Sequence, residues 1–277
     1  MDRRFHQVDV FTDTALRGNP LAVVLDAQGL TQAQMRDLAR WTQLSETTFV
    51  LPPTDPRADY RVRIFTPGGE LPFAGHPTLG TCQAWLWSGA KPRRADRIVQ
   101  ECGVGLVEIK AGQGPLAFAA PPLRRTGPID AQTLHQLMQA MGVSPEHVQD
   151  HQWVDNGPGW CALMLDGAER VLGLRPQLSA LGDLKVGVIG PHPVGGPADF
   201  EVRAFVPSLG IGEDPVTGSL NAGLAQWLFA TGRVTQAYSV RQGTCLGRDG
   251  RVWLSLQEGQ VWVGGHVVAC IQGHISL

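Results

Sequence analysis

Two titratable side chains in this sequence stand beside prolines, at the start of apolar segments. His76 lies in AGHPTLG and Asp214 lies in GEDPVTGS. A histidine that titrates near neutral pH is the usual proton carrier of enzymes, so His76 is a candidate acid–base residue. Aspartate is also among the preferred residues for capping a helix, so Asp214 has a structural and a catalytic interpretation. These residues alone leave both open.

An internal repeat connects the two residues. VRIFTP at 62–67 returns as VRAFVP at 202–207, and each copy is followed by a glycine-rich loop, a proline and an apolar segment. In this alignment His76 corresponds to Asp214. A repeat distance of about half the chain is too long for a solenoid and favours two similar halves. The apolar segments have few polar positions, which predicts two helices buried on all sides.

The two helix starts predict a site for a small acid. Backbone N–H groups without a partner and the helix dipole attract anions at a helix start. Glycines at 75, 80, 212 and 218 allow a ligand to approach the backbone closely. The chain has neither a phosphate-binding P-loop motif nor a convincing GxGxxG after a strand, so a nucleotide is not expected.

Four further residues have ordinary structural interpretations. Glu213 can be a solvated charge at a helix start, and Thr217 and Ser219 can bind the local backbone, Ser219 being the better ligand candidate. Glu46, in SETTFVL, lies between an expected helix and an expected strand. Such junctions often hold functional side chains, but position alone favours a solvated glutamate there.

Composition excludes several classes of function. The 277 residues are 43% hydrophobic and 17% charged, with a net charge of −2, so no basic face for nucleic acid is expected. No apolar run reaches the ~18 residues of a membrane-spanning helix, and the N-terminus has no signal-like apolar core. The five cysteines are scattered without a CxxC pair, and the histidines form no ligand pattern. We therefore expect a cytoplasmic protein without disulfides, metal, nucleic acid or membrane partners.

The elements that must position these residues follow an α+β pattern, because strands and helices do not alternate regularly. Helices are expected over Thr31–Gln43, which opens with a capping box, and over Ala131–Met141, which stops before a glycine. The apolar helices are expected over Pro77–Ser88 and Pro215–Ala230. Strands are expected in short runs rich in valine and aromatic residues: RFHQVDVF, PLAVVL, TTFVL, YRVRIFT, GLVEIK, LAFAA, WCALMLD, KVGVIG, FEVRAFVP, VWLSLQ and VWVGGHVVACI.

Four ordered motifs resemble the PhzF family of phenazine-biosynthesis isomerases: DVFTDTALRGNPLAVV, LSETTFV, FTPGGELPFAGHPTLG and GEDPVTGS. The similarity runs over nearly the whole chain. It implies the diaminopimelate-epimerase fold, in which two pseudo-symmetric halves each wrap strands around a central helix, with the site between them. The halves are expected over residues 1–120 and 128–277, joined by PPLRRTGPIDAQ, with a final strand that can return to the first half.

The resemblance also implies residue roles. Glu46 corresponds to the family's proton-transferring glutamate, His76 to its assisting histidine and Asp214 to its aspartate. Substrate binding is implied for a further set: Asn19, Ser45, Gly75, Gly218 and Ser219. Related epimerases and racemases use a cysteine at each helix start. This chain has His76 at one start and no cysteine around Asp214, which favours carboxylate-based isomerisation.

These roles imply a cofactor-independent isomerase that moves a proton within a small, conjugated, carboxylate-bearing substrate. We further expect a homodimer. Two alternatives stay open: an amino- or hydroxy-acid racemase or epimerase, with Glu46 and His76 as opposed bases, and a non-catalytic protein that binds small acids. Solvent deuterium entering one stereocentre, without movement of a double bond, would indicate the racemase or epimerase.

Overall fold

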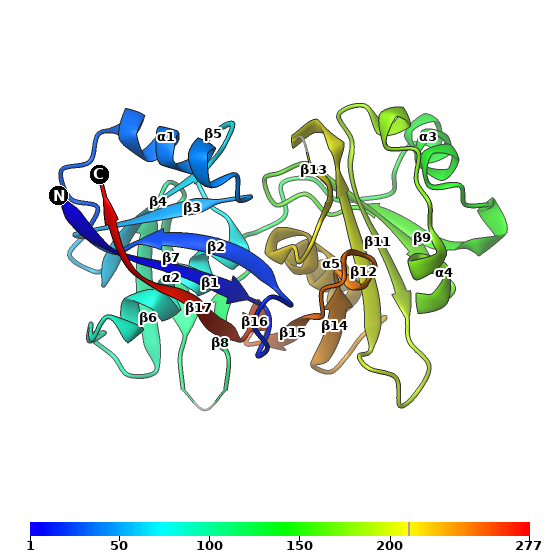
Figure 1. Cartoon of the computed structure of the whole chain (residues 1–277). Helices are drawn as coiled ribbons and strands as arrows, with labels where there is room; N and C mark the ends of the chain where they lie inside the picture. Colours follow the sequence, from blue (N-terminus) through cyan, green and yellow to red (C-terminus); the bar gives the residue numbers. More distant parts are fainter. Residues whose placement is uncertain (113, 210) are drawn as a thin grey trace. The chain divides into compact units, whose positions relative to one another are not determined.

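Strands predominate throughout the chain, with few helices between them (Figure 1). The computed structural model describes residues 1–112, 114–209 and 211–277. They divide into unit 1, Met1–Ala119 with Gly264–Leu277, and unit 2, Ala120–Val263. In the described ranges, no helix is both long enough and apolar enough to cross a membrane.

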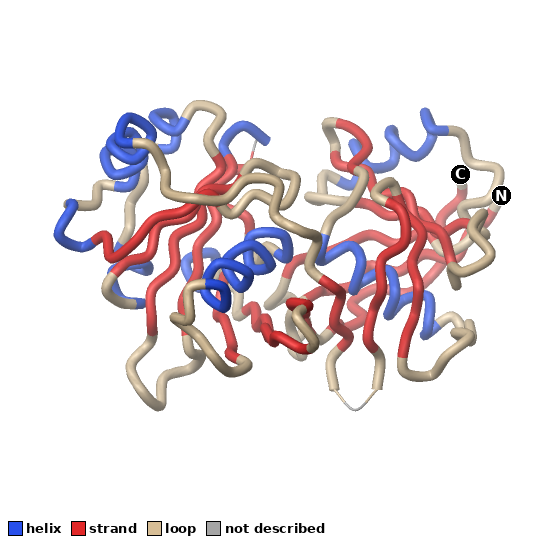
Figure 2. Tube along the Cα trace, turned by 180° about the vertical axis from the view of Figure 1, so that it is seen from behind, coloured by secondary structure: helices blue, strands red, loops and turns tan. Residues whose placement is uncertain are grey.

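Unit 1 is a mixed α+β assembly. The pairings β1–β2, β3–β4, β4–β5 and β6–β7 are antiparallel, and β2–β3 and β4–β6 are parallel. The last strand, β17, pairs with β1, so the two chain ends lie side by side (Figures 1 and 2). The elements are β1 (Asp2–Val10), β2 (Asn19–Val24), α1 (Gln32–Thr42), β3 (Thr47–Leu51), β4 (Tyr60–Thr66), β5 (Gly69–Leu71), α2 (Gly75–Trp87), β6 (Arg97–Cys102), β7 (Gly105–Lys110), β8 (Leu116–Ala119) and β17 (Val267–Ser276).

Unit 2 repeats this succession of pairings. The pairs β9–β10, β11–β12, β12–β13 and β14–β15 are antiparallel, and β10–β11 and β12–β14 are parallel. Both units are therefore α+β, as expected. The elements, with β16 ending just inside unit 1, are α3 (Ala131–Met141), β9 (Val148–Trp153), β10 (Trp160–Leu165), α4 (Ala168–Gly173), β11 (Lys185–Pro191), β12 (Phe200–Val206), β13 (Ile211–Asp214), α5 (Gly218–Ala230), β14 (Tyr238–Gln242), β15 (Gly250–Gln257) and β16 (Gln260–Gly265).

Each unit buries one apolar helix against its own strands. In unit 1, α2 contacts β1, β2, β3, β6, β8 and β17, and in unit 2, α5 contacts β10 and β15. Most residues of both helices are buried. This confirms the expectation of two buried helices, which the scarcity of polar positions predicted.

The expected starts of these two helices are wrong. Helix α2 begins at Gly75, two residues before Pro77, and α5 begins at Gly218, three residues after Pro215. Pro77 lies in the first turn, where its missing N–H is not needed. By contrast, α1 has the expected capping box at Thr31, and α3 ends before Gly142 in a left-handed conformation, as expected.

The repeated VRxF segments make the same ion pair in both units. The Arg63 guanidinium donates two hydrogen bonds to Glu70, at 2.7 and 2.6 Å. The Arg203 guanidinium does the same to Glu213, at 3.0 and 2.8 Å. Each arginine also lies over the phenylalanine two residues later, 5.1 and 4.9 Å from the ring centroid. Glu213 is therefore a buried partner of Arg203 rather than the solvated charge that the sequence suggested.

The strand register corrects the alignment of the repeat. Ile64 pairs with Leu71 in unit 1, and the corresponding residue of β12 pairs with Asp214 in unit 2. Asp214 thus corresponds to Leu71, and His76 corresponds to Ser219, because each of these is the second residue of its helix. The sequence alignment of His76 with Asp214 is wrong, because it matched prolines that occupy different positions.

Replacing Gly223 with alanine is expected to lower the free energy of unfolding by roughly 1–3 kcal/mol. A methyl group at this position in α5 would overlap the carbonyl oxygen of Val154, which is backbone and cannot rotate away. Gly173→Ala is the matched control, because nothing lies within 4 Å of that position in α4, and alanine favours a helix by up to ~1 kcal/mol. Denaturant unfolding measures both variants, and equal stabilities would contradict the close packing of α5.

Candidate active site

Four of the predicted site residues lie together in unit 1. The His76 Nε2 atom is 3.3 Å from the Glu46 Oε2 atom, and its Nδ1 atom is 3.4 Å from the Asn19 Nδ2 atom. The Ser45 hydroxyl donates to the Asn19 Oδ1 atom at 3.4 Å. Asn19 opens β2 and Glu46 directly precedes β3, and these strands are parallel, so both starts face the same edge of the sheet. Helix α2 brings His76 to this edge.

Burial determines the charge of His76, whose exposed fraction is 5%. Removal from water lowers the pKa of this imidazole to about 3, although an ionised Glu46 carboxylate would act in the opposite direction. The Nε2–Oε2 contact is also not aligned as a hydrogen bond. The pair is therefore a neutral imidazole beside a carboxyl group rather than a salt bridge. The Glu46 side chain is only 15% exposed, so the solvated glutamate favoured by position alone is wrong.

Asp214 ends β13 and is held by a polar network. Its Oδ2 atom accepts a hydrogen bond of 2.5 Å from the Thr217 hydroxyl, which in turn accepts from the Gln242 Nε2 atom at 2.9 Å. The Gln242 Oε1 atom accepts from the Thr217 N–H and from the Asn221 amide. The N-cap residue of α5 is Thr217. The interpretation of Asp214 as a helix cap is therefore wrong, because its carboxylate binds the cap residue's hydroxyl three residues away.

Two hydrogen-bond donors orient Ser219. Asn156 lies in the loop before β10, and Trp160 is the first residue of β10. The Trp160 Nε1–H donates to the Ser219 hydroxyl at 3.0 Å, and the Asn156 amide donates to the Ser219 carbonyl at 2.8 Å. An indole N–H only donates, so the Ser219 hydroxyl keeps its own hydrogen for another acceptor. Ser219 can therefore donate to a ligand.

The starts of α2 and α5 have no side-chain cap. The N-cap residues, Ala74 and Thr217, make no side-chain hydrogen bond to the first turn of either helix. Gly75 and Gly218 are the first helical residues, and both are buried. The N–H groups at these positions fit a carboxylate, which needs donors and a positive dipole end.

Sequence reasoning did not single out Gln242, Trp160 or Asn156, and it treated Thr217 as a local backbone binder. Gln242 ends β14 and lies outside the four motifs that carry the resemblance. Asn156 lies in the loop before β10 and Trp160 is the first residue of β10, and neither belongs to those motifs. These residues act through hydrogen bonds to distant segments, which no local pattern predicts.

Neither a reactive thiol nor a set of metal ligands is found among the described residues around His76 or Asp214. Cys82 lies inside α2, and burial raises its pKa to about 12, so it stays a protonated thiol. All five cysteines are free. Among the described residues, no three histidine, cysteine or acidic side chains are grouped as metal ligands would be.

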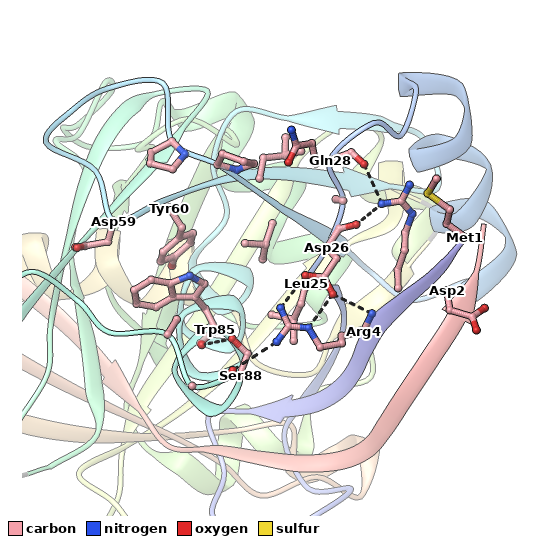
Figure 3. Close-up of a pocket in the computed structure, with 18 residues that line it drawn as sticks. Met1, Asp2, Arg4, Leu25, Asp26, Gln28, Asp59, Tyr60, Trp85 and Ser88 are labelled. Carbon is pink, nitrogen blue, oxygen red and sulfur yellow. Dashed lines mark hydrogen bonds and ion pairs between the residues drawn. The ribbon is translucent and has the colours of Figure 1, made fainter.

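A hollow of about 650 Å³ lies at another place in unit 1 (Figure 3). It is lined by the N-terminal end of β1, the turn after β2 and the end of α2, and by none of the candidate site residues. Its Arg4 side chain binds the Asp26 carboxylate through two hydrogen bonds of 2.7 Å and is half-exposed. The charges of Arg4 and Asp26 thus satisfy each other, and the hollow lies apart from Glu46 and His76.

Comparison with known protein families shows the family to which the chain belongs. The family described as PhzC-PhzF, phenazine biosynthesis-like protein, matches residues 8–273. The chain belongs to this family. It is similar to "Antisense-enhancing sequence 1" of Schizosaccharomyces pombe, with 35% identity over 98% of each protein. It is also similar to the trans-2,3-dihydro-3-hydroxyanthranilate isomerase of Pseudomonas fluorescens, with 34% identity over 87% of this chain and 86% of that protein.

Solved structures agree with the PhzF assignment. A PhzF-family protein of Enterococcus faecalis matches with a TM-score of 0.83 and 26% identity, over 100% of both chains. A hydroxyproline epimerase from Agrobacterium vitis matches with a TM-score of 0.61 and 14% identity, over 100% of this chain and 93% of that one, which shows a shared fold. The expected family is thus confirmed, and relatives named as isomerases agree with the expected enzyme class.

Proposed function

We propose that this PhzF-family protein is a cofactor-independent isomerase that moves a proton within a small, conjugated, carboxylate-bearing substrate. The observation that carries the proposal is the contact of 3.3 Å between the poorly exposed Glu46 carboxyl group and the buried His76 imidazole, whose pKa burial lowers. A poorly exposed carboxylate beside a neutral imidazole is suited to general-base catalysis, because little water competes for the proton. Family membership and the isomerase names of relatives support the reaction class.

In the proposed reaction, Glu46 takes a proton from an activated carbon of the substrate. The electron pair of the broken C–H bond enters the conjugated system, and the same carboxyl group returns the proton to another carbon. No electron leaves the substrate, so the step needs no oxidant. His76 and Asp214 are the further acid–base residues of this proposal, and either can carry a second proton.

The same proposal makes each uncapped helix start a binding position for a carboxylate. The N–H groups at Gly75 and Gly218 supply donors, and the Ser219 hydroxyl has a hydrogen to donate. On the Glu46 side, Ser45 remains a proposed contact, whereas Asn19, which the resemblance implies as another, is enclosed beside His76. The trans-2,3-dihydro-3-hydroxyanthranilate named for the Pseudomonas fluorescens relative is a carboxylate of this kind, and we take it as the first candidate substrate.

We also propose that the chain consists of two pseudo-symmetric halves of diaminopimelate-epimerase type. The repeated strand pairings and the matching arginine–glutamate pairs support this. In this proposal, His76 and Ser219 occupy equivalent positions at the starts of equivalent helices. A homodimer and a cytoplasmic location belong to the same proposal.

A racemase or epimerase is the second candidate, because the hydroxyproline epimerase has the same fold. Enzymes of that kind use a thiol at each helix start. The corresponding residues here are His76 and Ser219, and Cys82 lies further inside its helix. The absence of these thiols favours the isomerase. A small-acid-binding protein without catalysis is the third candidate.

Turnover in deuterated water distinguishes the three candidates. The protein is incubated with trans-2,3-dihydro-3-hydroxyanthranilate and followed by proton NMR. The isomerase is expected to shift a double bond and to introduce deuterium at the carbon that receives the proton. Deuterium at one stereocentre without a shifted double bond would indicate the epimerase instead. Chemical-shift changes of bound substrate without any exchange would leave only the binding protein.

A further inference from the structure

The amide of Asn19 faces the imidazole of His76 from a fully enclosed position. Asn19 is 1% exposed, and its Nδ2 atom lies 3.4 Å from the His76 Nδ1 atom. The other end of the amide, Oδ1, accepts from the Ser45 hydroxyl. An amide nitrogen only donates, so the Nδ1 atom that it faces must be the acceptor of this hydrogen bond.

We propose that Asn19 is a positioning residue that fixes His76 in the tautomer with its hydrogen on Nε2, the nitrogen that faces Glu46. The inference rests on the proposed function only for its catalytic meaning, since the tautomer itself follows from the contacts. A neutral imidazole carries one ring hydrogen, and an accepting Nδ1 leaves that hydrogen to Nε2.

This tautomer gives His76 a defined chemical role. The Nε2 atom is buried and lies 3.3 Å from the Glu46 Oε2 atom, yet it makes no aligned hydrogen bond among the described residues. A small movement lets the Nε2–H donate either to the carboxylate or to an oxygen of a bound substrate. A neutral imidazole that donates in this way polarises the substrate without supplying a full charge. With the opposite tautomer, Nε2 would be a second base beside Glu46.

The proposal also changes the role of Asn19. The family resemblance implies a substrate ligand, for which a side chain must reach the substrate. Instead, the side chain is enclosed, and its nitrogen is occupied by His76. A substrate ligand acts mainly on KM, whereas a residue that orients a catalytic imidazole acts mainly on kcat.

Nitrogen-15 NMR of histidine-labelled protein tests the tautomer directly and needs no turnover. The His76 signals are assigned by their loss in His76→Gln. In the wild type, Nε2 is expected to give the signal of a protonated nitrogen and Nδ1 that of an unprotonated one. The reverse pattern would overturn the proposal, whatever the activity of the protein proves to be.

Two variants then test the part played by Asn19. Asn19→Asp replaces the donor by an acceptor of the same shape and is expected to move the ring hydrogen to Nδ1. Asn19→Leu removes the donor and is expected to give a mixture of tautomers. Asn156→Leu is the matched control, because its amide binds the Ser219 carbonyl and does not contact His76. A wild-type pattern in both Asn19 variants would show that another group fixes the ring.

If the protein turns over the proposed substrate, steady-state kinetics also tests the role of Asn19. Asn19→Leu is expected to lower kcat on the order of 10²-fold with little change in KM, because a misoriented catalytic group loses about that factor. A rise in KM at unchanged kcat would return Asn19 to the role of substrate ligand. If no substrate is turned over, the proposed function fails, while the NMR result still decides the tautomer.

Discussion

Glu46→Gln is expected to lower the rate of deuterium entry into the substrate by roughly 10²–10⁴-fold, the contribution of a positioned general base. Glutamine keeps the size of the side chain and one acceptor, but it cannot take a proton at neutral pH. The Glu46 side chain is 15% exposed and lies beside His76, so the substitution changes the chemistry with little change in packing. Exchange is measured by NMR in deuterated water, and circular dichroism verifies the fold.

The matched control is Glu169→Gln. It makes the same chemical change on an exposed residue of α4 and is expected to leave exchange unchanged. Substrate binding by Glu46→Gln, followed by ligand-detected NMR, is expected to stay within a few-fold of the wild type. Full turnover by this variant would remove Glu46 from the mechanism and make His76 the next candidate for the base.

Local signals in the sequence predicted the two amphipathic helices well. Helix α1 has a complete capping box, in which Thr31 and Gln34 satisfy each other's groups. Helix α3 begins after Asp130, whose side chain accepts from the Thr133 N–H, and it ends before Gly142. These signals use only atoms within one turn, so they can be read without knowledge of the rest of the fold.

The starts of the buried helices could not be predicted in the same way. Proline is favoured at the first helical position, and this preference placed the starts at Pro77 and Pro215. In the structure, the starts at Gly75 and Gly218 follow short strands, and these strands pair with VRxF segments. The pairing of each short strand with its VRxF segment decides where the following helix begins. Such pairing leaves no periodic pattern in the sequence from which it could be predicted.

Several strands were missed because they are short or polar. Strand β5 has three residues, β9 reads VQDHQW and β14 reads YSVRQ. Such sequences form strands because neighbouring strands supply their hydrogen bonds. The family resemblance, rather than propensity, identified Glu46, since its contact with His76 joins residues thirty positions apart. The hydrogen bond from Gln242 to Thr217 was missed for the same reason, because these residues lie 25 positions apart.

Acidification from pH 6.5 towards pH 3 is expected to destabilise the protein through His76. Burial lowers the pKa of this imidazole from 6.5 to about 3 in the folded protein. Between these pH values, His76 binds a proton in the unfolded chain but not in the folded protein. The free energy of unfolding therefore rises with pH and falls as the pH decreases from 6.5, and the loss is complete below about pH 3.

The pKa difference of His76 sets an upper limit on this loss of stability. One pKa unit corresponds to about 1.4 kcal/mol, so the full difference amounts to roughly 4–5 kcal/mol. The Glu46 carboxylate, 3.3 Å away, stabilises a protonated His76 while it is ionised, so this figure is an upper limit. Typical proteins have only 5–15 kcal/mol in total. At this upper limit, the loss through His76 is a large share of the stability of a typical protein.

Comparison with His76→Gln isolates this contribution. The variant has no imidazole at position 76, so its free energy of unfolding is expected to depend less steeply on pH between 6.5 and 4. The carboxylates whose pKa values are lowered by arginine partners, such as Asp26 and Asp55, lose their contribution mainly below their ordinary value of 3.8. His6 acts in the same direction as His76, because burial lowers its pKa as well, so His6→Gln is measured beside it.

His135→Gln, the same substitution at an exposed position of α3, is the remaining control. Denaturant unfolding at half-unit steps of pH gives the four curves. Parallel curves for the wild type and His76→Gln over this range would show that His76 is already protonated in the folded protein. That result would make the contact between His76 and Glu46 a salt bridge. It would contradict both the proposal of a neutral His76 as a donor and the expected loss of stability in acid.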